Sequence, residues 1–430
     1  MEILKSNPVT KVLVEYGHHL RLFRPNARLY LMNVIIAGAA MGVFRLLFNF
    51  FVLSLGYDEA LLGNLVTASN LSALVVALPM GYLADLLGRK RSLLLSGALM
   101  AVAVVVMVLF PSTRVLLLMN LLWGVANSLA AVTMSPFLME NSGPEERTYL
   151  FSFGSGLQMA AASVGNWIGG YLPSWVGLAR GVDATHSQAY GGALLIIAVT
   201  YSLALVPLIL MREPRLERSE RSVFAPITYA AKHPGELTRM ILPLLLTSIG
   251  AGLIMPFMNV FFRQVYGQPD PVIGTLFAWG SLAMGLGLLI APPLADRMGK
   301  IQIVVITQGL SIPFLILLGF APWFWMSAIA YYMRVALMNM STPVYQTFVM
   351  ERVEPGARST VASLTSMSWN FGWAFSPTIS GWLQVHYGFG PAFIGTIVLY
   401  ALSVLLYWLF FWKGRGEPVP APERAPMPGD

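Results

Sequence analysis

Long apolar segments alternate with short polar joints along almost the whole chain. Each segment is continuously apolar, which argues against the alternating pattern of a membrane β-barrel. Each also approaches the roughly 20 residues that a helix needs to cross the hydrocarbon core of a bilayer. Spans are predicted near residues 29–56, 62–84, 93–110, 114–139, 148–172, 190–211, 239–263, 272–295, 302–321, 324–348, 360–384 and 390–412. The pattern therefore predicts an all-α membrane protein with twelve transmembrane helices.

The composition agrees with a chain that has the bilayer as its solvent. Of its 430 residues, 56% are hydrophobic and 11% are charged, whereas a soluble domain carries about 25% charged residues. The lack of Cys excludes disulfides, thiolate metal sites and cysteine nucleophiles. The five His residues pair with no obvious nucleophile or metal set, and no phosphate-binding loop occurs. We therefore expect neither an enzyme nor a bound cofactor or metal.

The basic residues predict the orientation of the chain. Of the 27 Lys and Arg residues, 22 fall on the side of the two termini, three on the opposite side, and two, Arg45 and Arg334, inside spans. This bias predicts that both termini are cytoplasmic in a cell (inner or plasma) membrane. It also accounts for the net charge of +7 without a nucleic-acid partner.

The longest joint divides the spans six and six. We expect a cytoplasmic segment with an interfacial helix at 1–28, a six-helix bundle at 29–211, a linker with an amphipathic segment at 212–238, a second bundle at 239–412 and a disordered, Pro-rich tail at 413–430. The partners expected are the lipid bilayer, a small-molecule substrate, and protons or another coupling ion, with the chain a monomer.

An internal repeat relates the two predicted bundles at an offset of 211 residues. The stretch LADLLG at 83–88 matches LADRMG at 294–299, and Gly63 and Gly170 match Gly274 and Gly381. Scarce residue types also recur, since Glu140 and Arg147 match Glu351 and Arg358. Because six spans separate equivalent residues, the copies cross the membrane in the same direction, as a parallel repeat.

These features resemble the major facilitator superfamily. GYLADLLGRKR at 81–91 is similar to the superfamily's motif after the second helix, and PPLADRMGK at 292–300 to its weaker copy after the eighth. The two Glu–Arg pairs resemble the E-x6-R pairs of sugar porters. The resemblance covers residues 29–412 and implies two pseudo-symmetric six-helix bundles that rock between two states (the major facilitator fold).

The resemblance also implies a charged latch that joins the bundles when the protein is open to the outside. The basic residues of these joints also obey the positive-inside rule, but an acid such as Asp85 does not help orientation. Opposite charges in a partly dry interface must pair to be tolerated. The latch residues expected are Gly81, Asp85, Gly88, Arg89, Glu140, Arg147, Asp296, Gly299, Lys300, Glu351 and Arg358.

Two bases inside the spans indicate where the substrate binds. Arg45 and Arg334 have no carboxylate in the middle of any predicted span, and an unpaired intramembrane charge marks a functional site by default. The alternatives are that Arg45 snorkels to water and that Arg334 bonds carbonyls of a broken neighbouring helix. The substrate-binding candidates are Arg45, Asn49, Asn127, Gln158, Tyr331, Arg334, Asn339, Trp369, Asn370 and Trp373.

The leading hypothesis is a secondary active transporter that moves a small organic solute with an anionic or zwitterionic group and an apolar part. The alternative is a proton-coupled multidrug exporter of hydrophobic or cationic compounds. Drug/proton antiporters carry G-P-x-x-G-G in the fifth span, where this chain has Asn166 in GNWIGG. This departure weakens the hypothesis of a proton-coupled multidrug exporter. A non-transporting receptor or a membrane enzyme is the alternative from a different class.

Overall fold

The computed structural model describes residues 23–143, 147–212, 234–353 and 358–413. Most of the predicted N-terminal segment, linker and tail (1–22, 213–233 and 414–430) lies outside the described residues. A helix occupies each of the twelve predicted spans, and most of these helices extend several residues beyond the predicted bounds.

The first six spans form one bundle. Its helices are α2 (Pro25–Ser54), α3 (Glu59–Leu87), α4 (Arg89–Leu109), α5 (Thr113–Glu140), α6 (Arg147–Arg180) and α7 (Ser187–Leu210). Helix α2 packs against α6 and α7, while α5 packs against α3 and α4. Asp58 begins α3 by accepting a hydrogen bond from the amide of Leu61 at 2.9 Å, which satisfies one of the free N–H groups of the first turn.

The last six spans form the second bundle. They are α9 (Pro234–Ile254) continued by η2 (Met255–Phe257) and α10 (Met258–Tyr266), then α11 (Asp270–Met298), α12 (Lys300–Phe320), α13 (Phe324–Arg352), α14 (Arg358–Tyr387) and α15 (Gly390–Tyr407) with the π-helical η4 (Trp408–Trp412). The seventh span is thus interrupted by one 3₁₀ turn at Met255–Phe257. Pro256 has no amide hydrogen to donate there, which favours the interruption.

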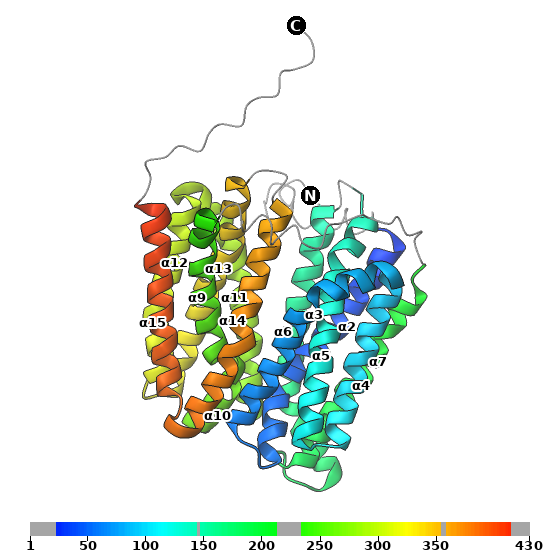
Figure 1. Ribbon diagram of the computed structural model, residues 1–430. Coiled ribbons are helices and arrows are strands. Elements are labelled where there is room, and N and C mark those ends of the chain that lie inside the picture. Colours follow the sequence, from blue (N-terminus) through cyan, green and yellow to red (C-terminus); the bar gives the residue numbers. More distant parts are fainter. Residues whose placement is uncertain (1–22, 144–146, 213–233, 354–357, 414–430) are drawn as a thin grey trace, which may run out of the picture.

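The bundles stand side by side and converge at one end (Figure 1). We call the end where α2 begins and η4 ends the terminal end, and the opposite end the distal end. In Figure 1 the helix axes of the two bundles come together at the distal end and diverge toward the terminal end. The contacts that join the bundles pair α3 with α14, α6 with α11, and α2 with α10.

Two equivalent glycines make the shortest joints at the terminal end. Gly88 separates α3 from α4 with φ 84°, and Gly299 separates α11 from α12 with φ 93°. A side chain with a Cβ rarely adopts such a positive φ. Both copies of the repeated motif therefore turn sharply at a glycine, and the turn at Gly88 brings Arg89 next to Asp85.

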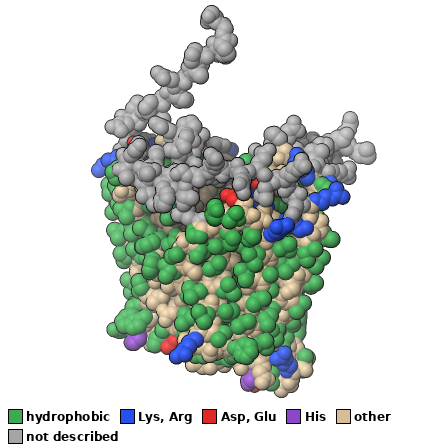
Figure 2. All heavy atoms as spheres, turned by 45° about the vertical axis from the view of Figure 1, so that its right-hand side comes forward, with side chains coloured by type: hydrophobic (Ala, Val, Ile, Leu, Met, Phe, Trp, Pro, Cys, Tyr) green, Lys and Arg blue, Asp and Glu red, His purple; other side chains and the backbone are tan. Residues whose placement is uncertain are grey.

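The outer surface is suited to lipid. Figure 2 shows a broad apolar band with Lys and Arg side chains gathered near its two edges. Within the described residues, nine spans are both long and apolar enough to cross a membrane. The other three predicted spans, which are less apolar, are α6, α13 and α14. Helices α6 and α14 carry the contacts with the other bundle, so part of their surface needs no lipid-compatible side chains.

Candidate functional site

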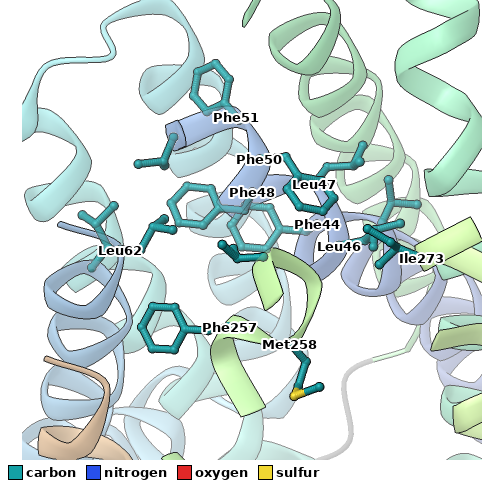
Figure 3. Close-up of a cluster of buried hydrophobic side chains, with 14 of the residues drawn as sticks. Phe44, Leu46, Leu47, Phe48, Phe50, Phe51, Leu62, Phe257, Met258 and Ile273 are labelled. Carbon is teal, nitrogen blue, oxygen red and sulfur yellow. The ribbon is translucent and has the colours of Figure 1, made fainter. Parts of the chain in front are cut away.

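A continuous apolar core closes the boundary between the bundles at the distal end. Phe44 and Phe48 of α2 belong to the same cluster of buried apolar side chains as Phe257 and Met258 of the second bundle (Figure 3). Removing this surface from water stabilises the contact by about 25 cal/mol per Å² of apolar area. The distal boundary is therefore a packed, water-excluding interface.

Two asparagines cross this boundary by matching hydrogen bonds. The amide of Asn49 donates to the carbonyl of Pro256 at 2.7 Å and to Oδ1 of Asn259 at 2.9 Å. The amide of Asn259 donates to the carbonyl of Leu46 at 2.8 Å. Each side chain thus binds the carbonyl three residues before the other asparagine. Both are buried, so these bonds are costly to leave unmade. We call this pair the amide clamp.

A buried ion pair joins the bundles next to the amide clamp. Arg263 of α10 binds the carboxylate of Asp270 of α11 and the hydroxyl of Tyr190 of α7. Tyr190 also donates to the second oxygen of Asp270 at 2.7 Å, and the Arg263 guanidinium lies 3.7 Å from the centre of the Phe50 ring. Asp270 is 6% exposed and is the only buried carboxylate among the described side chains. We call these residues the distal ion-pair cluster.

The repeated glycines lie where the helices of opposite bundles touch. A Cβ on Gly63 of α3 would lie 2.3 Å from the carbonyl oxygen of Pro377 in α14. A Cβ on the equivalent Gly274 of α11 would lie 2.5 Å from the carbonyl oxygen of Asn166 in α6. Both obstacles are backbone atoms of the other bundle. A glycine therefore occurs at this position in both copies of the repeat because each copy makes the same close contact with the other bundle.

Arg45 lies on the face of α2 that turns toward the second bundle. It precedes Asn49 by four residues, and residues i and i+4 share a helix face. Because Asn49 reaches the second bundle, Arg45 faces the boundary one turn nearer the terminal end. Its side chain is exposed and makes no hydrogen bond or ion pair within the described part of the chain. The phenol of Tyr201 is within electrostatic range.

Arg334 lies at a similar distance from the distal end but is covered. Its guanidinium donates to the Tyr400 hydroxyl at 3.0 Å and lies 3.4 Å from the sulfur of Met255. The side chain is only 2% exposed. The broken neighbouring helix does supply one contact, although through the Met255 side chain instead of a carbonyl. The role of Arg334 as a substrate ligand stays a prediction.

The remaining substrate-binding candidates divide by exposure. Asn127, Gln158, Trp369 and Asn370 are exposed, whereas Tyr331, Asn339 and Trp373 are partly buried. Asn339 bonds the carbonyl of Val335 in its own helix at 2.8 Å. Asn49 belongs to the amide clamp, so its side chain is already engaged in this state. The structure therefore leaves Arg45 as the candidate with an exposed charge.

The predicted latch residues form one network in each bundle. Arg89 binds Asp85 at 2.6 Å and Glu140 at 3.0 Å. The equivalent Lys300 binds Glu351. Gly88 and Gly299 occupy the joints beside these pairs, and Gly81 lies within α3. The side chains of Arg147, Asp296 and Arg358 lie outside the described residues. Each pair stays within its own bundle in this state, and a cross-bundle role remains a prediction.

Four important residues at the boundary were not predicted from the sequence as functional: Tyr190, Asn259, Arg263 and Asp270. The sequence signal for Arg263 and Asp270 is a base and an acid seven residues apart around a predicted short loop. The signal for Asn259 is a lone amide in an apolar span. Within the described residues, no group of His, Cys, Asp and Glu is arranged to hold a metal ion.

A protein-family model described as the Major Facilitator Superfamily matches residues 30–267 and 240–428. Similar curated proteins include the multidrug resistance protein MdtG of Proteus mirabilis (strain HI4320), which is 22% identical over 77% of this chain and 81% of its own. MdtG of Dickeya zeae (strain Ech586) is 23% identical over 76% of this chain and 79% of its own.

Similar solved structures share the fold at low identity. A bacterial homolog of the human lysosomal transporter Spinster, in an inward-facing and unoccupied conformation, has a TM-score of 0.73 at 15% identity over 92% of this chain and 96% of its own. The nucleoside transporter NupG has a TM-score of 0.74 at 12% identity, over 91% of this chain and 100% of its own. A D-xylose-proton symporter has a TM-score of 0.70 at 16% identity, over 90% and 97%.

Proposed function

Because the chain belongs to the major facilitator superfamily and is a secondary transporter, we propose that its cargo is a small organic solute with an anionic or zwitterionic group and an apolar part. The observation that carries this proposal is Arg45. It is an exposed, unpaired cation that faces the boundary between the bundles, one helical turn from the amide clamp that closes this boundary. An acidic group of the cargo would supply the missing partner, and charge-assisted hydrogen bonds are the strong ones.

The membrane orientation follows from the basic residues. Arg89, Lys90, Arg91, Arg239 and Lys300 are at the terminal end, and basic residues favour the cytoplasmic side. We therefore place the terminal end in the cytoplasm. In that orientation the distal end is closed and cargo reaches Arg45 from the cytoplasm, a state that suits the loading step of an exporter. The cell (inner) membrane is the proposed location, with the protein working as a monomer.

A proton-coupled multidrug exporter is the second candidate, and the names of the MdtG relatives favour it. Their identity of 22–23% leaves the cargo open. A cationic drug would find no acid near Arg45, because the described acidic residues lie at helix ends. We therefore favour amphipathic acids as the drugs that such an exporter would move, with protons or another ion as the coupling partner.

A binding experiment tests the proposed cargo class. Purified protein is heated with pairs of aromatic compounds that differ only in a carboxylate or a neutral carboxamide. We expect the acids to raise the melting temperature of the wild type more than the amides do, since stabilisation follows RT ln(1 + [L]/Kd). Arg45→Gln should lose the difference, and Arg114→Gln, at the distal end, should keep it. An unchanged preference for acids in Arg45→Gln would contradict the proposal.

A further inference from the structure

The guanidinium of Arg334 is buried without enough partners. Two of its nitrogens meet the Tyr400 hydroxyl and the Met255 sulfur, and the third, Nε, has no hydrogen-bond partner. Sulfur is a weak acceptor, and a guanidinium carries five N–H donors. The group therefore has donor capacity that its present neighbours do not use.

The charge of Arg334 has no counter-ion among the described residues. The described ion pairs involve Arg89, Arg263 and Lys300 instead. The buried carboxylate of Asp270 forms its ion pair with Arg263. An arginine does not lose its proton in a protein, so it cannot escape the cost of burial by becoming neutral. A water molecule would complete a hydrogen bond to Nε but would not balance the charge.

The internal repeat reveals how this position differs between the bundles. At the offset of 211, Arg334 corresponds to Trp123 and Met255 to Phe44. In the first bundle the rings of Phe44 and Trp123 stack with their centres 4.3 Å apart. In the second bundle the thioether of Met255 lies against the guanidinium of Arg334 instead. A cation therefore replaces an aromatic ring at an equivalent buried place, where packing alone gives no reason for a charge.

Met255 covers Arg334 on the side of the boundary. It belongs to η2 and is only partly buried, and the carbonyl of the next residue, Pro256, accepts the hydrogen bond of Asn49 from the first bundle. Methionine is unbranched and adapts its shape readily. Movement of this one side chain would uncover the guanidinium.

We propose that Arg334 and Tyr400 form a second anion-binding site, with Met255 as its movable cover. The ligand is a small monoanionic group that accepts hydrogen bonds from the free Nε–H of Arg334. Two sources supply this chemistry: a dissolved halide ion, or the acidic group of the cargo. The cargo source rests on the proposed function, and the halide source does not.

The test measures the thermal stability of the purified full-length protein at constant ionic strength. Chloride or bromide replaces gluconate in one titration, and an aromatic carboxylate is added in a second. We expect a saturable rise in melting temperature in at least one titration, following mass action. Arg334→Gln should abolish that rise, while Arg45→Gln should keep any halide response.

A second variant protects the test against misfolding of Arg334→Gln. Tyr400→Phe removes one hydroxyl and keeps the cation, so it should raise the half-saturating anion concentration roughly tenfold or less, as expected for one lost hydrogen bond. A halide response that is lost in Arg334→Gln and weakened in Tyr400→Phe identifies a dissolved ion as the ligand. A response to the carboxylate alone, with the same changes in the two variants, identifies the cargo.

The proposal is overturned if the wild type responds to neither anion. It is also overturned if both variants respond as the wild type does. Failure of the proposed function is a separate result, because it is read from the preference for acids in Arg45→Gln, whatever happens at Arg334.

Discussion

Asn49 and Asn259 bind each other across the boundary of the two bundles, and each also binds the backbone carbonyl three residues before its partner. This arrangement has an approximate two-fold symmetry that follows the repeat of the chain. It fastens the distal ends while the exposed Arg45 lies one turn away on the open side. Transport by alternating access requires this clamp to open, so its residues set how readily the distal end opens.

The first prediction concerns the amide clamp. Asn49→Ala removes the donor that Oδ1 of Asn259 and the carbonyl of Pro256 share, which costs about 1–3 kcal/mol in the closed state. We expect the population with an open distal end to rise accordingly. Because the chain lacks Cys, spin labels on two introduced cysteines, one at the distal end of each bundle, can report the distance between them.

Asn70→Ala is the matched control for this variant. The Asn70 side chain bonds the carbonyl of Val66 within its own helix at 2.8 Å, so its removal should leave the distal distance distribution unchanged. If Asn49→Ala gave the same distribution as Asn70→Ala, the clamp would have no part in closure.

The second prediction concerns the close contact at Gly63. Gly63→Ala places a methyl group where the carbonyl oxygen of Pro377 lies 2.3 Å away. Since backbone does not yield cheaply, we expect the distal ends to separate and the label distance to increase. Gly156→Ala is the control, because a Cβ there meets nothing within 4 Å and alanine favours the helix. Equal distances in both variants would contradict the packing argument.

The third prediction concerns the distal ion-pair cluster. Asp270→Asn leaves the Arg263 charge against Phe50 without its counter-ion, and breaking a buried ion pair in this way costs about 3–5 kcal/mol. We expect a clear loss of thermal stability together with distal opening. Glu59→Gln changes the more exposed contact with Gln264 at the same end and should shift the melting temperature little. Similar melting curves for the two variants would contradict the stabilising role of the buried pair of Arg263 and Asp270.

The fourth prediction separates stability from transport at the latch. Asp85 is half exposed, with 51% of its side chain accessible, in its pair with Arg89, and such pairs contribute roughly 1 kcal/mol or less. We expect Asp85→Asn to change the melting temperature little in this state. If the latch joins the bundles in the distal-open state, the same variant should slow cargo flux in vesicles. An unaltered flux would leave Asp85 without a conformational role.

The sequence predicted the fold well because its main features are local. The sharp joints at Gly88 and Gly299 lie in short motifs that recur at the repeat offset. Such features depend on neighbours in the chain or on the repeat offset. Twelve spans and their grouping into two bundles follow for the same reason.

The amide clamp escaped prediction because a 3₁₀ turn alters the register of the repeat. Asn49 and Asn259 are 210 residues apart, one fewer than the repeat offset. A 3₁₀ turn advances each residue by 120° instead of 100°, so the three residues of η2 add about 60° of rotation. That rotation brings Asn259 toward the direction that residue 260 would otherwise take. The sequence reveals neither this turn nor the contact between Met255 and Arg334.

The central claim is that Arg45 recognises the acidic group of a transported solute. The most direct measurement is flux through purified protein in proteoliposomes, with an aromatic carboxylate and its neutral amide as matched cargo. We expect the wild type to move the acid faster, and Arg45→Gln to lower the acid flux by roughly 10- to 150-fold, as a lost charge-assisted bond of about 1.5–3 kcal/mol requires. The amide flux should stay the same. Acid flux at the wild-type rate in Arg45→Gln would contradict the account.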